Sequence, residues 1–92
     1  MSIEKTLADL NQKLVQAQAD LKIVEEQLLY QMDVVEETKT RALVAETPLA
    51  EREYRIARDD CARLQQQREE GLKTIADLKS EQDRLLDRML TS

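Results

Sequence analysis

The chain has 92 residues and a net charge of −5, with 36% charged residues and only 2% aromatic residues. This length allows one domain at most, and a chain without phenylalanine or tryptophan lacks the large side chains that usually dominate a globular core. Acidic and basic residues are interspersed, and no segment approaches the roughly 18 apolar residues of a membrane span, so neither nucleic acid nor a membrane is an expected partner.

A first helix is predicted over residues 3–45. Its apolar residues alternate in steps of four and three, a heptad spacing that indicates a helix packed along one side against another helix. We call these positions the seam. In this helix the predicted seam is Ile3, Leu7, Leu10, Leu14, Ala17, Leu21, Val24, Leu28, Gln31, Val35, Thr38, Ala42 and Ala45.

Apolar residues off the seam gather in the segment LLYQMDVV, residues 28–35. Leu29 and Tyr30 fall on the outer face of the helix, whereas Met32 and Val34 flank the seam. A two-helix hairpin buries only a narrow stripe, and contiguous exposed apolar patches mark interfaces. We therefore predict that these four residues form a partner interface. A widened seam is the alternative interpretation for Met32 and Val34.

The segment at residues 46–50 is predicted to reverse the chain. Pro48 lacks an N–H group and favours the first turn of a helix, and Thr47 before it is a suitable N-cap. The heptad phase also shifts here, which leaves two arms of nearly equal length. We predict an antiparallel hairpin; one long helix, kinked at Pro48 in a parallel dimer, is the alternative.

A second helix is predicted over residues 50–90. Its seam consists of Ala50, Tyr54, Ala57, Cys61, Leu64, Arg68, Gly71, Ile75, Leu78, Gln82, Leu85 and Met89. Two alignments of the arms place one seam on the other, in which the numbers of facing residues add to 92 or to 99. The second is preferred, because it places Leu28 opposite Gly71 and pairs the polar Gln31 with Arg68.

These patterns predict an all-α fold. Residues 1–92 form one coiled-coil domain, an antiparallel helical hairpin (two-helix coiled coil) that dimerises into a four-helix bundle, because packing two hairpins together buries a wider stripe on each helix. The expected partner is a second copy, so the protein is predicted to be a homodimer. A heterologous partner helix is the alternative.

The sequence contains little that could carry catalysis. There is no histidine, which is the usual general base and the commonest transition-metal ligand. The single cysteine, Cys61, lies on the seam as a small core residue, and there is no glycine-rich phosphate loop. We expect no enzymatic activity, no cofactor and no metal. The first ten residues carry charges and no apolar run, which favours a cytoplasmic location over secretion.

The segment EREYRIARDD, residues 51–60, is similar to part of the coiled-coil domain of bacterial Gre-type transcript-cleavage factors. The similarity is carried by Glu53, Tyr54, Ala57, Arg58, Asp59 and Asp60. It implies a helical hairpin whose tip enters the secondary channel of RNA polymerase. Where that family places acidic residues at its tip, this chain has Thr47 and Ala50.

Two functions are therefore compatible with the sequence. The first is a non-catalytic interaction or scaffold protein that acts through helix-face contacts. The alternative is a regulator that uses the tip of the hairpin to contact a large complex such as RNA polymerase. Its expected contacts are Thr47, Leu49, Glu51 and Arg52.

Overall fold

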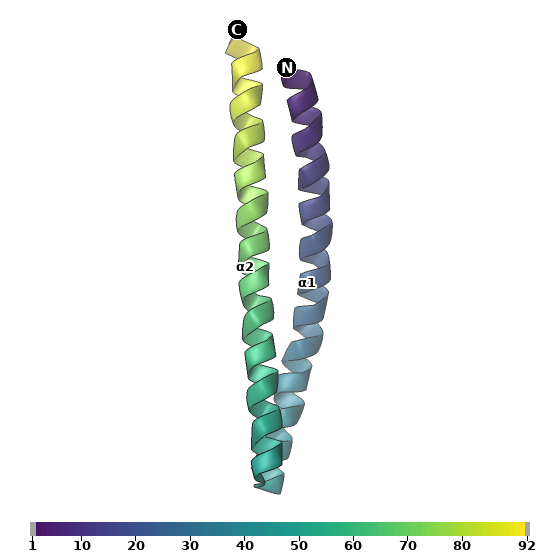
Figure 1. The fold of residues 1–92 in the computed structure, drawn as a ribbon, viewed down its shortest axis with the longest axis vertical. Coiled ribbons are helices and arrows are strands. Elements are labelled where there is room, and N and C mark those ends of the chain that lie inside the picture. Colours follow the sequence, from purple (N-terminus) through teal and green to yellow (C-terminus); the bar gives the residue numbers. More distant parts are fainter. Residues whose placement is uncertain (1, 92) are drawn as a thin grey trace. The chain divides into compact units, whose positions relative to one another are not determined.

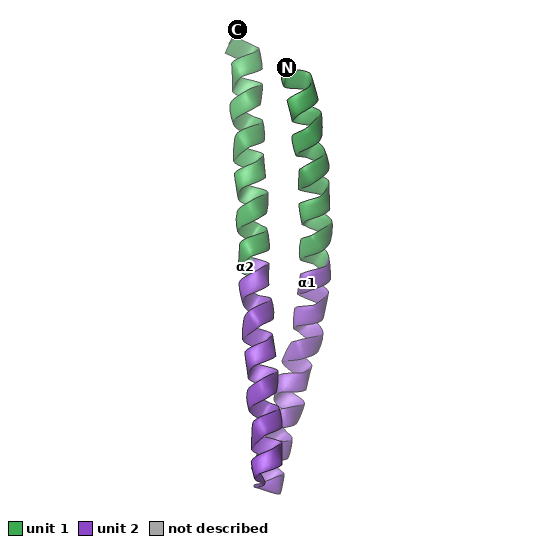
Figure 2. Cartoon of the chain, viewed as in Figure 1, with its two compact units in different colours: residues 1–22, 69–92 green, residues 23–68 purple. Residues whose placement is uncertain are grey.

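The computed structural model describes residues 2–91. They form two long helices, α1 (Ile3–Ala45) and α2 (Pro48–Thr91), joined by Glu46 and Thr47 (Figure 1). No strand occurs among these residues, so the predicted all-α class and the helical hairpin are confirmed. The chain divides into two compact units (Figure 2): unit 1 consists of residues 1–22 and 69–92, and unit 2 of residues 23–68.

The turn in unit 2 is built from the residues that the sequence indicated. The Thr47 hydroxyl accepts a hydrogen bond of 3.2 Å from the backbone N–H of Ala50, which confirms Thr47 as the N-cap of α2. Pro48 takes the first helical position. Glu46 has a left-handed backbone, with φ of 50°, and its N–H donates to the carbonyl of Ala42 at 3.2 Å. This is the αL arrangement that commonly ends a helix.

The predicted seam agrees with the burial of side chains in both units. Every buried side chain in the described part of the chain belongs to it: Leu14, Thr38, Ala50, Ala57, Cys61 and Leu85. Most other seam positions are half-buried, whereas Ala45 and Met89, near the ends of their helices, are exposed. The Thr38 hydroxyl donates to the carbonyl oxygens of Val34 and Val35, at 2.8 and 3.0 Å, which satisfies a buried polar group within the helix itself.

The preferred alignment of the two arms is wrong. Gly71 lies against Leu21, and a Cβ atom at this glycine would be 3.3 Å from the Cδ1 atom of Leu21, so their numbers add to 92. Arg68 forms an ion pair with Glu25 at 3.2 Å rather than facing Gln31. Each unit thus follows the alignment that the sequence analysis rejected.

The short turn explains this alignment. Because only two residues connect α1 to α2, residues at equal distances from the turn must face each other, and Arg41 accordingly pairs with Glu53 at 3.4 Å. The polar seam residues Gln31 and Arg68 form hydrogen bonds with other groups rather than with each other. The Arg68 guanidinium reaches Glu25, and the Gln31 side-chain amide donates to the Ala57 carbonyl oxygen at 3.1 Å.

The exposed ion pair between Glu81 and Arg84, in unit 1, shifts the pKa values of both residues. Arg84 donates two hydrogen bonds to the carboxylate of Glu81, one of them 3.0 Å long. The hydrogen bonding lowers the pKa of Glu81 below its ordinary value and raises the pKa of Arg84. Both groups are in water, where such pairs contribute little to stability.

Candidate interaction surface on the first helix

The outer side of α1 in unit 2 carries a row of exposed apolar side chains. We define the outer face by Ile23, Leu29, Tyr30, Leu43 and Val44. Ile23, Tyr30 and Val44 are spaced by seven and fourteen residues, and Leu29 and Leu43 by fourteen. These intervals keep the residues on one side of a helix. Leu29 is 67% exposed, Tyr30 71% and Val44 80%. The seam of α1 is occupied by its contact with α2, so this helix is apolar on two sides.

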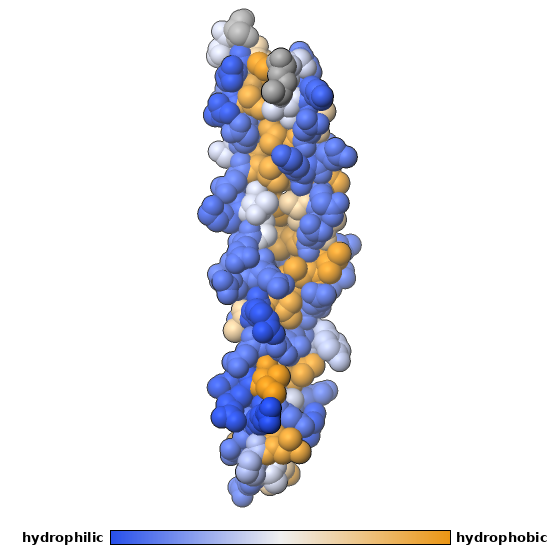
Figure 3. Space-filling view, viewed as in Figure 1, coloured by the Kyte–Doolittle hydropathy of each residue, from blue (hydrophilic) through white to orange (hydrophobic). Residues whose placement is uncertain are grey.

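The four residues predicted as a partner interface do not share one environment. Leu29 and Tyr30 are strongly exposed and Met32 is about half exposed, whereas Val34 is half-buried beside the seam. Burial by α2 therefore accounts for part of Val34 and leaves the other three in solvent. In the space-filling view, apolar atoms likewise reach the surface between polar side chains (Figure 3).

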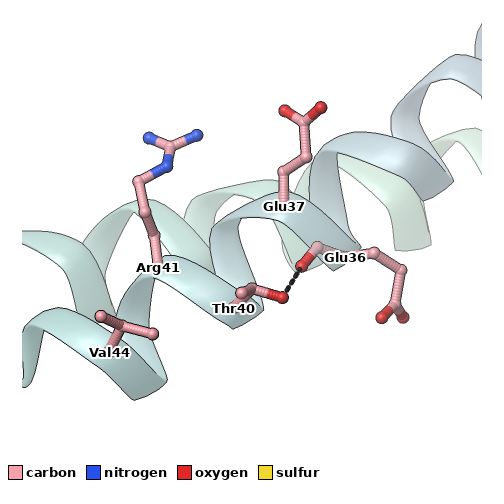
Figure 4. Close-up of a pocket in the computed structure, with 5 residues that line it drawn as sticks. All are labelled: Glu36, Glu37, Thr40, Arg41 and Val44. Carbon is pink, nitrogen blue, oxygen red and sulfur yellow. Dashed lines mark hydrogen bonds between the residues drawn. The ribbon is translucent and has the colours of Figure 1, made fainter.

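Two open recesses lie along α1 in unit 2. The first is lined by residues of α1 alone (Figure 4). In it, the Thr40 hydroxyl donates a hydrogen bond of 3.1 Å to the carbonyl oxygen of Glu36. Its full lining is Glu36, Glu37, Thr40, Arg41 and Val44. The second is beside the aromatic ring of the outer face, and it is lined by Glu26, Gln27, Tyr30, Gln31 and Leu64. Both are shallow depressions of the kind that a partner side chain can occupy, rather than enclosed cavities.

The acids beside the outer face have no cationic partner within residues 2–91. The carboxylates of Asp33, Glu36 and Glu37 form no salt bridge there, although Glu37 and Arg41 both extend from the same side of the helix (Figure 4). Arg41 is directed to Glu53 of α2 instead. The outer face thus consists of apolar residues, and the acidic side chains between them form no salt bridge within residues 2–91.

The exposed surface of α2 in unit 2 carries basic residues among its apolar ones. Leu49 and Ile56 are exposed on it, and Arg52 and Arg55 are exposed basic residues that form no salt bridge within the described chain. The other arginines of this segment are engaged: Arg58 stacks over the Tyr54 ring at 4.9 Å, Arg63 pairs with Asp60, and Arg68 pairs with Glu25. The sequence pattern alone did not separate the unpaired arginines from the paired ones. Arg58 and Arg63 find their partners within α2, and only Arg68 reaches across to α1.

The predicted tip residues lie at the turn and are all exposed: Thr47, Leu49, Glu51 and Arg52. Leu49 is 67% exposed although it is large and apolar. Thr47 already uses its hydroxyl to cap α2, so mutation of this residue changes the helix end as well as the surface.

The other chemically reactive groups of residues 2–91 are one thiol and scattered acids. Cys61 is a buried free thiol on the seam. Over residues 2–91, no group of histidine, cysteine, aspartate or glutamate side chains is arranged to hold a metal ion. Neither α1 nor α2, as described, has a stretch long and apolar enough to cross a membrane.

Comparison with known proteins adds no relative. The chain matches no protein-family model, no curated protein and no solved structure.

Proposed function

We propose that this chain is a non-catalytic interaction protein, a scaffold or adaptor that self-associates through contacts of its helix faces. The observation that supports it is the outer face of α1 in unit 2, where Leu29 and Tyr30 remain in water although α1 is packed along its seam. Contiguous exposed apolar residues rimmed by polar ones are typical of protein–protein contacts. The proposal retains the cytoplasmic location that the sequence favours.

The size of the outer face is compatible with a dimer. Burying an apolar side chain is worth about 1.5–3 kcal/mol, so five partly exposed residues from each of two copies represent on the order of 10–20 kcal/mol of gross stabilisation. Association costs about 4–15 kcal/mol in lost freedom of motion. The two ranges overlap, and a dimer of moderate affinity is therefore expected.

Light scattering coupled to size exclusion tests the proposal. The unaltered protein is expected to elute as a dimer, and the double substitution Leu29→Glu with Tyr30→Glu is expected to yield a monomer, because two carboxylates cannot be buried unpaired. Gln65→Glu with Gln67→Glu, on exposed positions of α2, is the matched control and should remain dimeric. Circular dichroism checks that each variant stays helical. A well-folded monomer for the unaltered chain would contradict self-association and favour a heterologous partner helix on this face.

A second function is supported by the exposed Leu49 at the turn. In it, the hairpin presents its tip to a large complex such as RNA polymerase, as the resemblance of residues 51–60 implies. Binding of purified bacterial RNA polymerase separates the two functions. Under this alternative, Glu51→Ala weakens binding and leaves the oligomeric state unchanged, whereas Leu29→Glu with Tyr30→Glu leaves binding intact.

A further inference from the structure

Charge decides which surface of a second copy the outer face of α1 can accept. Asp33, Glu36 and Glu37 lie among the apolar residues of this face and form no salt bridge within residues 2–91. If the outer faces of two α1 helices packed together, these acids would meet their own counterparts. Like charges brought together at an interface are unfavourable, so an α1-to-α1 contact is disfavoured.

The exposed surface of α2 in unit 2 offers the complementary charge. Leu49 and Ile56 supply apolar area there, and Arg52 and Arg55 supply positive charge and form no salt bridge within residues 2–91. Within one molecule, α2 is held against the seam of α1. This basic and apolar surface is therefore available to the outer face of another copy.

The spacing of the two surfaces also matches. Acidic and apolar residues of α1 follow one another in steps of three, and basic and apolar residues of α2 do the same, so both lie along the ridges that helices use in packing. When α1 runs parallel to α2 of a second copy, one alignment satisfies the whole row. The facing pairs are then Tyr30 with Leu49, Asp33 with Arg52, and Glu36 with Arg55.

We infer that the outer face of α1 binds the Leu49–Arg55 surface of α2 in a second copy of this chain. The inference rests on the proposed self-association and specifies its geometry. In this arrangement α1 of one copy lies against α2 of the other. The charges pair between copies rather than within one.

Charge reversal on either surface tests this arrangement. One variant carries Asp33→Arg with Glu36→Arg, and the other carries Arg52→Glu with Arg55→Glu. Each is expected to be at least tenfold weaker in self-association than the unaltered protein, because its two surfaces now carry the same sign. When the two variants are mixed, α1 of one variant meets an α2 of opposite charge on the other, and a dimer containing one copy of each should form.

Native mass spectrometry and light scattering measure the outcome, with circular dichroism as a check on folding. Asp9→Arg with Glu69→Arg, at exposed positions in unit 1, is the matched control and should dimerise normally. An unaltered protein that is monomeric overturns the proposed self-association together with this inference. An unaltered protein that dimerises overturns the inference alone if both reversed variants still dimerise, or if mixing them restores nothing.

Discussion

The two units differ in the size of the side chains that they bury. Unit 2, which contains the turn, buries the small residues Thr38, Ala50, Ala57 and Cys61, whereas unit 1 buries Leu14 and Leu85. The distance between packed helices depends on the side chains at their contact. Because only two residues join α1 to α2, the helices are close together near the turn, and small side chains at their contact make this short distance possible. Unit 1 is therefore stabilised mainly by apolar area, and unit 2 by a close fit, so opposite kinds of substitution should disrupt them.

The largest effect is expected from removing apolar area in unit 1. Leu85→Ala should lower the free energy of unfolding by about 2–4 kcal/mol, because it deletes a buried leucine and leaves a cavity. Leu86→Ala is the matched control; its side chain is 43% exposed, and its loss should cost less than half as much. Denaturant unfolding followed by circular dichroism, at one fixed protein concentration, measures both. Equal costs at the two positions would show that unit 1 has no defined core.

Added volume should be the more damaging change in unit 2. Ala57→Leu is expected to cost about 1–3 kcal/mol, because it inserts a large side chain into a site that is 4% exposed. Ala62→Leu makes the same change at an exposed position of the same helix and should be nearly neutral. The same unfolding measurement applies. If Ala57→Leu stabilised the protein, the helices of unit 2 would be packed less closely than their small residues indicate.

The sequence was sufficient to predict the helices and the seam, because heptad spacing is a local signal that repeats many times. It was insufficient for the alignment of the arms. Both alignments place seam on seam, and matching polar residues in pairs favoured the incorrect one. In the structure, Arg68 is satisfied by Glu25, which is next to the seam rather than on it, and Gln31 is satisfied by a backbone oxygen. Long polar side chains can reach such partners, so pairing by residue type does not determine alignment.

Part of the candidate surface was predictable from the heptad spacing alone. Leu29 and Tyr30 are outside the seam in any alignment, and the structure leaves them exposed. The basic surface at Arg52 and Arg55 was not foreseen, because the sequence shows acids within reach of every arginine in this segment but not which of them form salt bridges. The turn carried the missing information. Thr47 and Pro48 were identified as its signals, but the length of the turn was overestimated.

The turn itself holds one residue in an unfavourable conformation. Glu46 has φ of 50°, a region that costs a non-glycine residue about 1–2 kcal/mol. Glu46→Gly should relieve this cost, but it also increases the entropy of the unfolded chain, so the expected net gain is about 1 kcal/mol. Lys39→Gly, within α1, is the control and should destabilise by about the same amount. A destabilised Glu46→Gly would imply that the Glu46 side chain makes a stabilising contact.

The smallest expected effect returns to unit 1 and tests how closely its helices pack. Gly71 lies within α2 with no positive φ, so Gly71→Ala should gain about 1 kcal/mol in helix propensity. The added methyl group would be 3.3 Å from the Cδ1 atom of Leu21, slightly too close, and 3.8 Å from its Cβ atom. Because Cδ1 is the end of a flexible side chain, it can shift by a small rotation, and a net gain of about 0.5 kcal/mol is expected. Gly71→Val, which adds bulk that Leu21 cannot avoid, should be destabilising. If Gly71→Ala were destabilising as well, unit 1 would pack as tightly at this glycine as unit 2 does at its alanines, and the contrast between the units would hold only at the buried leucines.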